Sequence, residues 1–455
     1  MSAEIIDNTI KIRRYNKLGS RISRLNRRFN SYMFLFTSGL FMFLSAAHYA
    51  GYNTKLLRDI SSVCLLGTVV IVNYTMPRKQ YFKSKAVYVL MFGACAWMAW
   101  YIFTYVTGLV EVTDFRAAYK ITARVALTAI FFLGARITIA YDLKIYFLGV
   151  ALIATGSILA LNYLRFFDGL NFISRIGSLL LANGRYRNAY GFTHPNDAGI
   201  ACCYFIIISL LYNMALETRT RNQYKNILMS QYIYILCIIT FLMMMSTGSR
   251  SAITSLAMFL MVYFLLGMYK KNAVTANALL VVSIILVAFF AMIAIDWYFL
   301  IIQSGRLQNF MPIMKMSADE LITGYGYIDY LGEGFLKWGS KLGFGKYLDS
   351  MYANVIISSG IVGFCLFFIP LTLSIMMFFR NVREMTKLQR AIGASFVQVM
   401  YYFMFEQHLY DFMWYSLVIW IISIIIMNEK AQTIKNNVAS FTIQTRRTKI
   451  CNGLC

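Results

Sequence analysis

Acidic residues and prolines are both scarce in this chain. Only 19 of its 455 residues are Asp or Glu, against 43 Lys or Arg, and charged residues make up 14% of the sequence. A soluble globular domain carries nearer a quarter charged residues, so the composition excludes an ordinary soluble protein. Of the four prolines, only Pro370 falls within a long apolar run. The runs therefore contain few residues that would break a helix.

Cysteines and carboxylates lie in patterns that disfavour metal sites. Six of the eight cysteines fall within apolar runs, and the other two, Cys451 and Cys455, are in the C-terminal tail. None of the long polar loops holds a cysteine pair, so neither a disulfide framework nor a zinc site is predicted. The polar segments also lack a cluster of carboxylates, which a divalent cation prefers as ligands. We therefore expect no metal and no other cofactor.

Apolar residues make up 59% of the sequence and gather in long runs. About 20 such residues cross a hydrocarbon core as a helix, so the runs predict an all-α, polytopic membrane protein with about twelve spans. The predicted spans are 31–51, 59–76, 86–110, 121–140, 145–164, 197–216, 228–246, 251–269, 275–300, 351–379, 389–406 and 409–428. The span 121–140 is the weakest prediction, because Arg124 and Arg136 flank a short apolar core.

The distribution of basic residues predicts the orientation in the membrane. With the N-terminus inside, the inner segments carry 27 Lys and Arg and the outer loops carry 14 over longer stretches, as the positive-inside rule requires. An even number of spans places both termini in the cytoplasm. The basic excess is then a topology signal and an attraction to anionic membrane lipid, and nucleic acid is disfavoured as a partner.

The chain divides into three predicted parts. Residues 1–30 are basic, and their apolar residues recur every three or four positions, which predicts an amphipathic helix on the inner membrane surface. Residues 31–428 form the transmembrane domain, and 429–455 form a basic cytoplasmic tail. Two extracytoplasmic loops, 165–196 and 301–350, are much longer than the other connections. Long loops in compact proteins are usually functional or disordered, so we expect the chemistry on the outer side.

The outer segment "RYRNAYGFTHPND" (185–197) holds Arg185, Arg187 and His194 directly before a predicted span. The Pro-Asn-Asp sequence that follows His194 is typical of a helix start. Helix capping and ligand binding therefore explain the presence of Asn196 equally well. Capping does not explain two arginines and a histidine in the same short segment.

Two further arginines lie in predicted outer segments. In "STGSRSA" (246–252), Arg250 stands at a turn before a predicted helix, and the backbone N–H groups at the start of a helix favour an anion. The alternative is an ordinary turn in which the arginine side chain reaches the lipid headgroups. Arg306 stands beside a glycine in "SGR". Downstream, Ser317 and Glu320 have the spacing of a capping box, which predicts a short helix.

Acidic, tyrosine and histidine side chains complete the outer candidates. Asp349 and Tyr352 lie where the predicted span 351–379 begins, and Asp349 is also a natural helix cap. Glu406 and His408 lie at the outer tip of the last predicted helical hairpin. Arginines on several outer segments indicate one anionic substrate, because guanidinium groups bind phosphate oxygens bidentately and stay charged.

Five motifs in order resemble the Wzy-type polysaccharide repeat-unit polymerases, which share a superfamily with the O-antigen ligases. They are "RNAYGFTHPND" (187–197), "STGSRSA" (246–252), "SGR" (304–306), "GYGY" (324–327) and "DSMYANVIISSGIVG" (349–363). The resemblance implies a membrane glycosyltransferase that polymerises undecaprenyl-diphosphate-linked oligosaccharides into capsular polysaccharide, exopolysaccharide or O-antigen at the outer face of the bacterial cytoplasmic membrane. It also implies a flippase and a chain-length regulator as partner proteins.

The resemblance assigns roles to individual residues. Arg187, Arg250 and Arg306 match the family's arginine positions and are expected to bind the substrate diphosphate, with Arg185 as a weaker addition. Asn196 matches its "PN" position. The remaining expected roles are catalytic for Asp349, His194 and Glu406, and substrate-positioning for Asn196, Tyr352 and His408. Ligases typically have a histidine where this chain has Asp349, which favours a polymerase and leaves the general base open.

Two alternatives stay open. An O-antigen-ligase-like transferase would move finished glycan to another acceptor. A flippase or transporter of lipid-linked oligosaccharide fits twelve spans and inside termini equally well. Transporters often have broken helices, repeated halves and ionisable residues inside the membrane, and the sequence shows few prolines in its spans and no repeat.

Overall fold

The computed structural model of the chain describes residues 2–76, 82–110, 115–166, 188–192, 194–217, 223–272, 275, 310–326, 350–404 and 413–431. Side chains are described for these residues except 2–24, 116 and 223–228. Every regular element in the described ranges is a helix, which confirms the all-α prediction. Ten of the described helices are long and apolar enough to cross a membrane. The chain is therefore a polytopic membrane protein.

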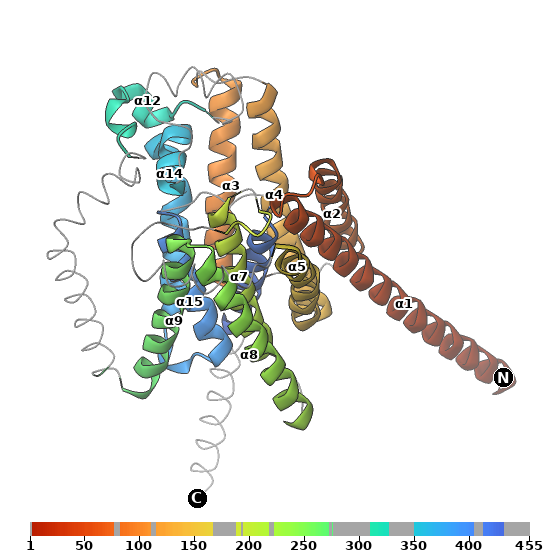
Figure 1. The fold of residues 1–455 in the computed structure, drawn as a ribbon. Helices are drawn as coiled ribbons and strands as arrows, with labels where there is room; N and C mark the ends of the chain where they lie inside the picture. Colours follow the sequence, from red (N-terminus) through yellow and green to blue (C-terminus); the bar gives the residue numbers. More distant parts are fainter. Residues whose placement is uncertain are drawn as a thin grey trace, which may run out of the picture.

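The helices form one bundle in which most connections are short (Figure 1). Their bounds are α1 Ser2–Tyr49, α2 Lys55–Thr75, α3 Lys85–Val106, α4 Phe115–Tyr141, α5 Lys144–Phe166, α7 Pro195–Glu217, α8 Gln223–Ser246, α9 Arg250–Lys271, α12 Ala318–Thr323, α14 Met351–Phe379 and α15 Lys387–Tyr402. A last helix, Trp414–Ala431, is called the C-terminal helix below. Two 3-10 turns, η2 (Ile313–Lys315) and η3 (Val382–Glu384), complete the described elements.

Ten of the twelve predicted spans coincide with membrane-length helices. The predicted span 275–300 lies outside the described residues except for Thr275. The predicted span 389–406 corresponds to α15, whose 16 residues rise only about 24 Å, less than the roughly 30 Å of a hydrocarbon core. The total number of spans stays a prediction.

The amphipathic helix predicted over residues 1–30 and the predicted span 31–51 both fall in α1. This helix has 48 residues, runs from Ser2 to Tyr49 without a break and rises about 72 Å. The basic segment and the first span are therefore continuous. The position of the basic segment on the inner membrane surface stays a prediction.

Polar contacts mark two opposite ends of the bundle. Asn162 near the end of α5 donates to the carbonyl of Tyr190 in the loop before α7 (2.7 Å). At the opposite end of the bundle, Asn30 of α1 donates to Thr75 and Tyr141 at the ends of α2 and α4 (3.1 and 3.2 Å). We call these the Tyr190 end and the Asn30 end. The basic residues of the sequence predict that the Tyr190 end faces outward.

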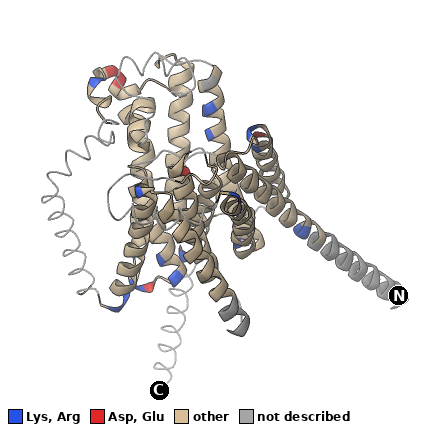
Figure 2. Ribbon diagram, viewed as in Figure 1, with Lys and Arg blue, Asp and Glu red and all other residues tan. Residues whose placement is uncertain are grey.

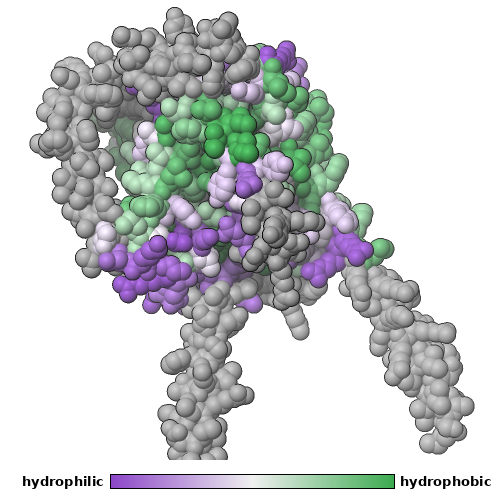
Figure 3. All heavy atoms as spheres, turned by 60° about the horizontal axis from the view of Figure 1, so that its bottom comes forward, coloured by the Kyte–Doolittle hydropathy of each residue, from purple (hydrophilic) through white to green (hydrophobic). Residues whose placement is uncertain are grey.

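The surface matches a membrane protein. In Figure 2, Lys and Arg gather at the lower ends of the helices, with few acidic residues among them. Figure 3 turns that lower end forward and shows hydrophilic residues gathered there, with a broad apolar face above them. Apolar side chains on that scale are stable only when covered by lipid or protein.

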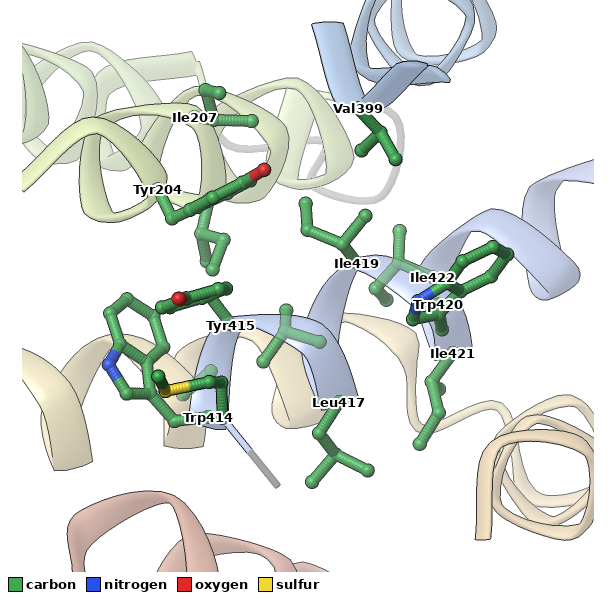
Figure 4. Packing of buried hydrophobic residues seen from close by; sticks show 14 of the residues in the cluster. Tyr204, Ile207, Val399, Trp414, Tyr415, Leu417, Ile419, Trp420, Ile421 and Ile422 are labelled. Atoms are coloured by element: carbon green, nitrogen blue, oxygen red, sulfur yellow. The ribbon is translucent and has the colours of Figure 1, made fainter. Parts of the chain in front are cut away.

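The core lies around the C-terminal helix. Of the 18 most apolar consecutive residues of the C-terminal helix, 89% are buried, and the corresponding share for α7 is 78%. In the other helices of membrane length this share is between 28% and 50%. Tyr204 of α7 stacks on Tyr415 with ring centroids 4.6 Å apart (Figure 4). The Tyr204 hydroxyl accepts a hydrogen bond from the buried side chain of Gln398 in α15 (3.1 Å). The centre of the bundle is thus α7 packed against the C-terminal helix.

The helix α14 is bent sharply at Gly360. Its backbone there has φ 67° and ψ −177°, a conformation essentially restricted to glycine. In a straight helix Tyr352 and Phe368 would lie about 24 Å apart, yet their ring centroids are separated by 4.7 Å. The arms 351–359 and 361–379 therefore fold back toward each other. The span predicted over 351–379 therefore coincides with α14, but the sequence did not predict the bend at Gly360.

Candidate functional site

The loop before α7 packs against the turn between α8 and α9. The Tyr190 hydroxyl shares a hydrogen bond with Ser246 Oγ, and both residues are buried. One turn into α7, Gly199 lies against the same turn: a Cβ on Gly199 would come within 2.9 Å of Thr247 Oγ1 and closer to Ser249. The first two motifs of the resemblance thus meet at the Tyr190 end, as their predicted placement on one side requires.

A left-handed turn shapes this loop. Tyr190 and Gly191 have φ values of 45° and 78°, of which the first is uncommon for a residue with a side chain. The Asn188 side chain accepts from the Tyr190 N–H (2.9 Å) and Asn162 donates to its carbonyl (2.7 Å). Gly51, just after the end of α1, has no side chain and so leaves room for the Gly191 carbonyl. A Cβ on Gly51 would clash with that carbonyl oxygen. Local polar contacts therefore hold the loop in a conformation that its own backbone does not favour.

His194 acts as a cap at the start of α7. Its Nδ1 accepts a hydrogen bond from the backbone N–H of Asn196 (3.1 Å), and its carbonyl accepts from Asp197 (3.0 Å). Because Nδ1 accepts, the proton of the neutral ring is on Nε2. The exposed ring therefore presents an N–H donor, and a general-base role would require it to give up the cap.

Arg250 is the first residue of α9 and its side chain is exposed. Ser249 before it is the N-cap and is fully buried against α7. The N-terminus of a helix favours negative charge through its free N–H groups and its dipole. Arg250 therefore adds a cation to a helix end that already attracts anions, on the same end of the bundle as His194.

The short helix α12 docks into the bend of α14. The N–H groups of Tyr325 and Gly326 donate to the carbonyls of Ile357 and Ser358 (2.8 and 3.0 Å). Gly324 has φ 78°, and a Cβ on it would lie 2.6 Å from backbone atoms of the bend. The "GYGY" motif and the motif at 349–363 therefore form one structural unit.

The sequence also predicted how α12 starts. The Ser317 hydroxyl accepts from the Glu320 N–H (3.4 Å), and the Glu320 carboxylate accepts from the Ser317 N–H (2.7 Å). This is the predicted capping box, and it confirms the short helix. The box fixes the direction in which the chain enters the bend.

Aromatic residues and an arginine lie beside the bend. Trp100 Nε1 donates to the carbonyl of Ser359 (2.9 Å). The guanidinium of Arg124 in α4 lies 5.5 Å from the ring centroid of Trp97 and 5.9 Å from that of Tyr101. Sequence reasoning treated Arg124 only as a flank of a weak span and missed this cluster. The available signal was an arginine inside an apolar run, which is by default a functional candidate.

Tyr352 was expected to position substrate, but the structure gives its hydroxyl another contact. The hydroxyl donates to the carbonyl of Met400 in α15 (2.9 Å), and the ring lies against Phe368 and Phe403. Tyr352 thereby fastens the first arm of α14 to α15. A direct contact of its hydroxyl with substrate would need this bond to open.

Six of the expected site residues lie outside the described residues: Arg185, Arg187, Arg306, Asp349, Glu406 and His408. The described residues next to two of them are in contact. Ser350 Oγ and the Met351 N–H both donate to the carbonyl of Phe403 (3.3 and 2.9 Å). Ser350 follows Asp349, and Phe403 lies three residues before Glu406, so the segments with these two carboxylates start from one point of the bundle.

The comparisons with known proteins add no assignment. The chain matches no protein-family model and no curated protein. In the part of the chain that the structure describes, no three His, Cys, Asp or Glu side chains lie together as metal ligands. The function is therefore inferred from the motifs and from how the described helices bring them together.

Proposed function

We propose that the protein is a membrane glycosyltransferase that polymerises lipid-diphosphate-linked oligosaccharide repeat units at the outer face of a bacterial cytoplasmic membrane. The observation that carries the proposal is the pairing of the motifs. Those at 187–197 and 246–252 meet through Tyr190 and Ser246, and those at 324–327 and 349–363 meet at the α14 bend. Binding and catalytic residues are found disproportionately on loops that a rigid scaffold positions.

The proposed reaction is a displacement at an anomeric carbon. A hydroxyl at the non-reducing end of the incoming repeat unit attacks the anomeric carbon of the growing glycan. The bond to the lipid diphosphate breaks, and the diphosphate leaves with the electron pair. Arg187, Arg250 and Arg306 stabilise the negative charge that develops on it, and such electrostatic stabilisation usually contributes most to the rate enhancement of an enzyme.

The attacking hydroxyl loses its proton to a carboxylate in this mechanism. Asp349 and Glu406 are the preferred bases, because Ser350, which follows Asp349, bonds to Phe403, which lies three residues before Glu406. His194 is better suited to donate an N–H to a substrate oxygen, since its Nδ1 already caps α7. A base within hydrogen-bond reach of the attacking hydroxyl typically contributes about 10²–10⁴-fold in rate.

A transporter of lipid-linked oligosaccharide is the second candidate, and one observation favours it. Transporters often bind substrate at broken helices, and the sequence, with few prolines in its spans, argued against such a break. The bend of α14 at Gly360 removes that argument. A ligase-type transferase would share the donor chemistry of the polymerase and differ in its acceptor.

The test is reconstitution of the full chain in proteoliposomes with an undecaprenyl-diphosphate-linked repeat unit. A ladder of glycans supports the polymerase, a single transfer to another acceptor supports the ligase, and movement of unchanged substrate across the bilayer supports the transporter. Arg250→Ala should abolish the ladder, and Arg250→Lys should restore it only in part, because lysine lacks the bidentate fork. The matched control is Lys315→Ala, which removes an exposed cation from η2. A normal ladder from Arg250→Ala would refute the assignment of this arginine.

A further inference from the structure

A cavity of about 380 Å³ lies between α1 and α5, and none of the residues assigned to glycan chemistry lines it. Its walls include Arg27, Arg28, Tyr32 and Leu35 of α1 and Tyr146 of α5. None of the described residues that line it is acidic, so its two guanidinium groups give it a net positive charge. Guanidinium groups bind phosphate oxygens in a bidentate fork.

The cavity lies where the polar Asn30 end meets the apolar surface of the bundle. Asn30, one turn beyond Arg27, bonds to Tyr141, and the Arg27 guanidinium lies 5.8 Å from the ring centroid of Tyr141. In the first turn of α5, Lys144 forms an ion pair with Glu429 of the C-terminal helix (2.7 Å). A layer of polar contacts therefore closes the bundle at this level, which is where lipid headgroups meet a membrane protein.

An apolar stripe runs along α1 from the cavity toward the middle of the bundle. Tyr32, Phe36, Leu40 and Phe43 follow at intervals of three or four residues and therefore lie on one face of the helix. Their side chains are 70%, 71%, 38% and 38% exposed, respectively. A molecule with an anionic head and a hydrocarbon chain matches both the charged cavity and this stripe.

We propose that the cavity binds the phosphate headgroup of an anionic phospholipid of the surrounding bilayer. Arg27 and Arg28 hold the phosphate oxygens, and one acyl chain lies along Tyr32, Phe36 and Leu40. The bound lipid fills the space between α1 and α5 and so ties the first span to the bundle. The site is independent of the proposed glycan chemistry.

The test compares two double variants of the purified full chain. Arg27→Gln/Arg28→Gln removes both charges from the cavity. Lys271→Gln/Arg383→Gln removes the same charge from exposed positions near the ends of α9 and α14, outside the cavity. Native mass spectrometry and thermal unfolding measure binding of phosphatidylglycerol, with phosphatidylcholine and inorganic phosphate as separate arms. We expect the cavity variant to bind phosphatidylglycerol at least tenfold more weakly than the wild type, and the control variant to bind as the wild type does.

Three results would overturn the proposal. Equal loss in both double variants would mean general attraction to a basic surface. Equal binding of phosphatidylcholine would mean that the headgroup charge is not recognised, and equal stabilisation by inorganic phosphate would assign the cavity to a free anion. If the cavity variant does not fold, Ser31→Trp serves as a second variant, because it fills the cavity and keeps both arginines. It should lower phosphatidylglycerol binding in the same way, and unchanged binding would refute the site.

Discussion

Replacing Gly360 with alanine tests whether the bend of α14 holds the α12 segment in place. A residue with a Cβ at this backbone conformation costs about 1–3 kcal/mol, and the Cβ would also strike the carbonyl of Ile322. If α12 moves away, the hydrogen bonds donated by Tyr325 and Gly326 are lost, each worth about 0.5–1.5 kcal/mol. Gly360→Ala should therefore lower the free energy of unfolding by about 2–6 kcal/mol.

The measurement is equilibrium unfolding of the purified protein in detergent micelles. Gly67→Ala in α2 is the matched control, because a Cβ on Gly67 meets nothing within 4 Å and alanine favours a helix over glycine by about 1 kcal/mol. We expect Gly67→Ala to be neutral or stabilising. Equal stability of the two variants would refute the reasoning about the bend.

A cross-linking assay tests the same bend directly. Tyr352→Cys and Phe368→Cys, introduced together on a background without the native cysteines, should be joined by a short bismaleimide, because the native rings are in contact. A straight helix would hold these positions about 24 Å apart and give no product. Gly360→Ala should reduce the yield, and the absence of cross-links in the parent would show that the arms do not fold back.

Three further predictions follow from contacts described above. Tyr204→Phe leaves the buried amide of Gln398 without its hydroxyl partner and should cost about 1–3 kcal/mol in equilibrium unfolding, most of which Gln398→Leu should restore. Tyr190→Phe and Ser246→Ala each remove one partner of the same hydrogen bond. A double-mutant cycle of unfolding free energies should therefore give a coupling energy of at least about 0.5 kcal/mol, and additive effects would contradict the contact. Arg124→Gln removes the cation beside its aromatic neighbours and should cost about 0.5–2 kcal/mol, whereas unchanged stability would show that this contact contributes nothing.

Local features of the fold could be predicted from the sequence because their causes are local. Apolar runs predicted ten helices of membrane length, since the hydrophobic requirement acts on each segment separately. The capping box at Ser317 and Glu320 was predicted from spacing alone and is present. The sequence also placed the motifs of Tyr190 and Ser246 on one side of the membrane, but it did not predict that these two residues are in contact.

The features that the sequence missed depend on contacts between distant segments. Pro370 was the visible helix breaker, yet α14 continues through it and bends at Gly360, where α12 supplies the hydrogen bonds. The helix α15 ends at Tyr402, before the predicted end of the span 389–406, and the carbonyl of Phe403 accepts from the Met351 N–H. Arg124 is visible as a charge, but periodicity cannot tell that Trp97 of another helix faces it.

The deep burial of the C-terminal helix has a consequence for biogenesis. Trp414–Ala431 fills the centre of the bundle, yet it is the last described helix to leave the ribosome. Until it is inserted, buried side chains of its neighbours, such as Tyr204 and Val399, lack the contacts that it provides. The earlier described helices therefore reach their native packing only after this helix has entered the bundle.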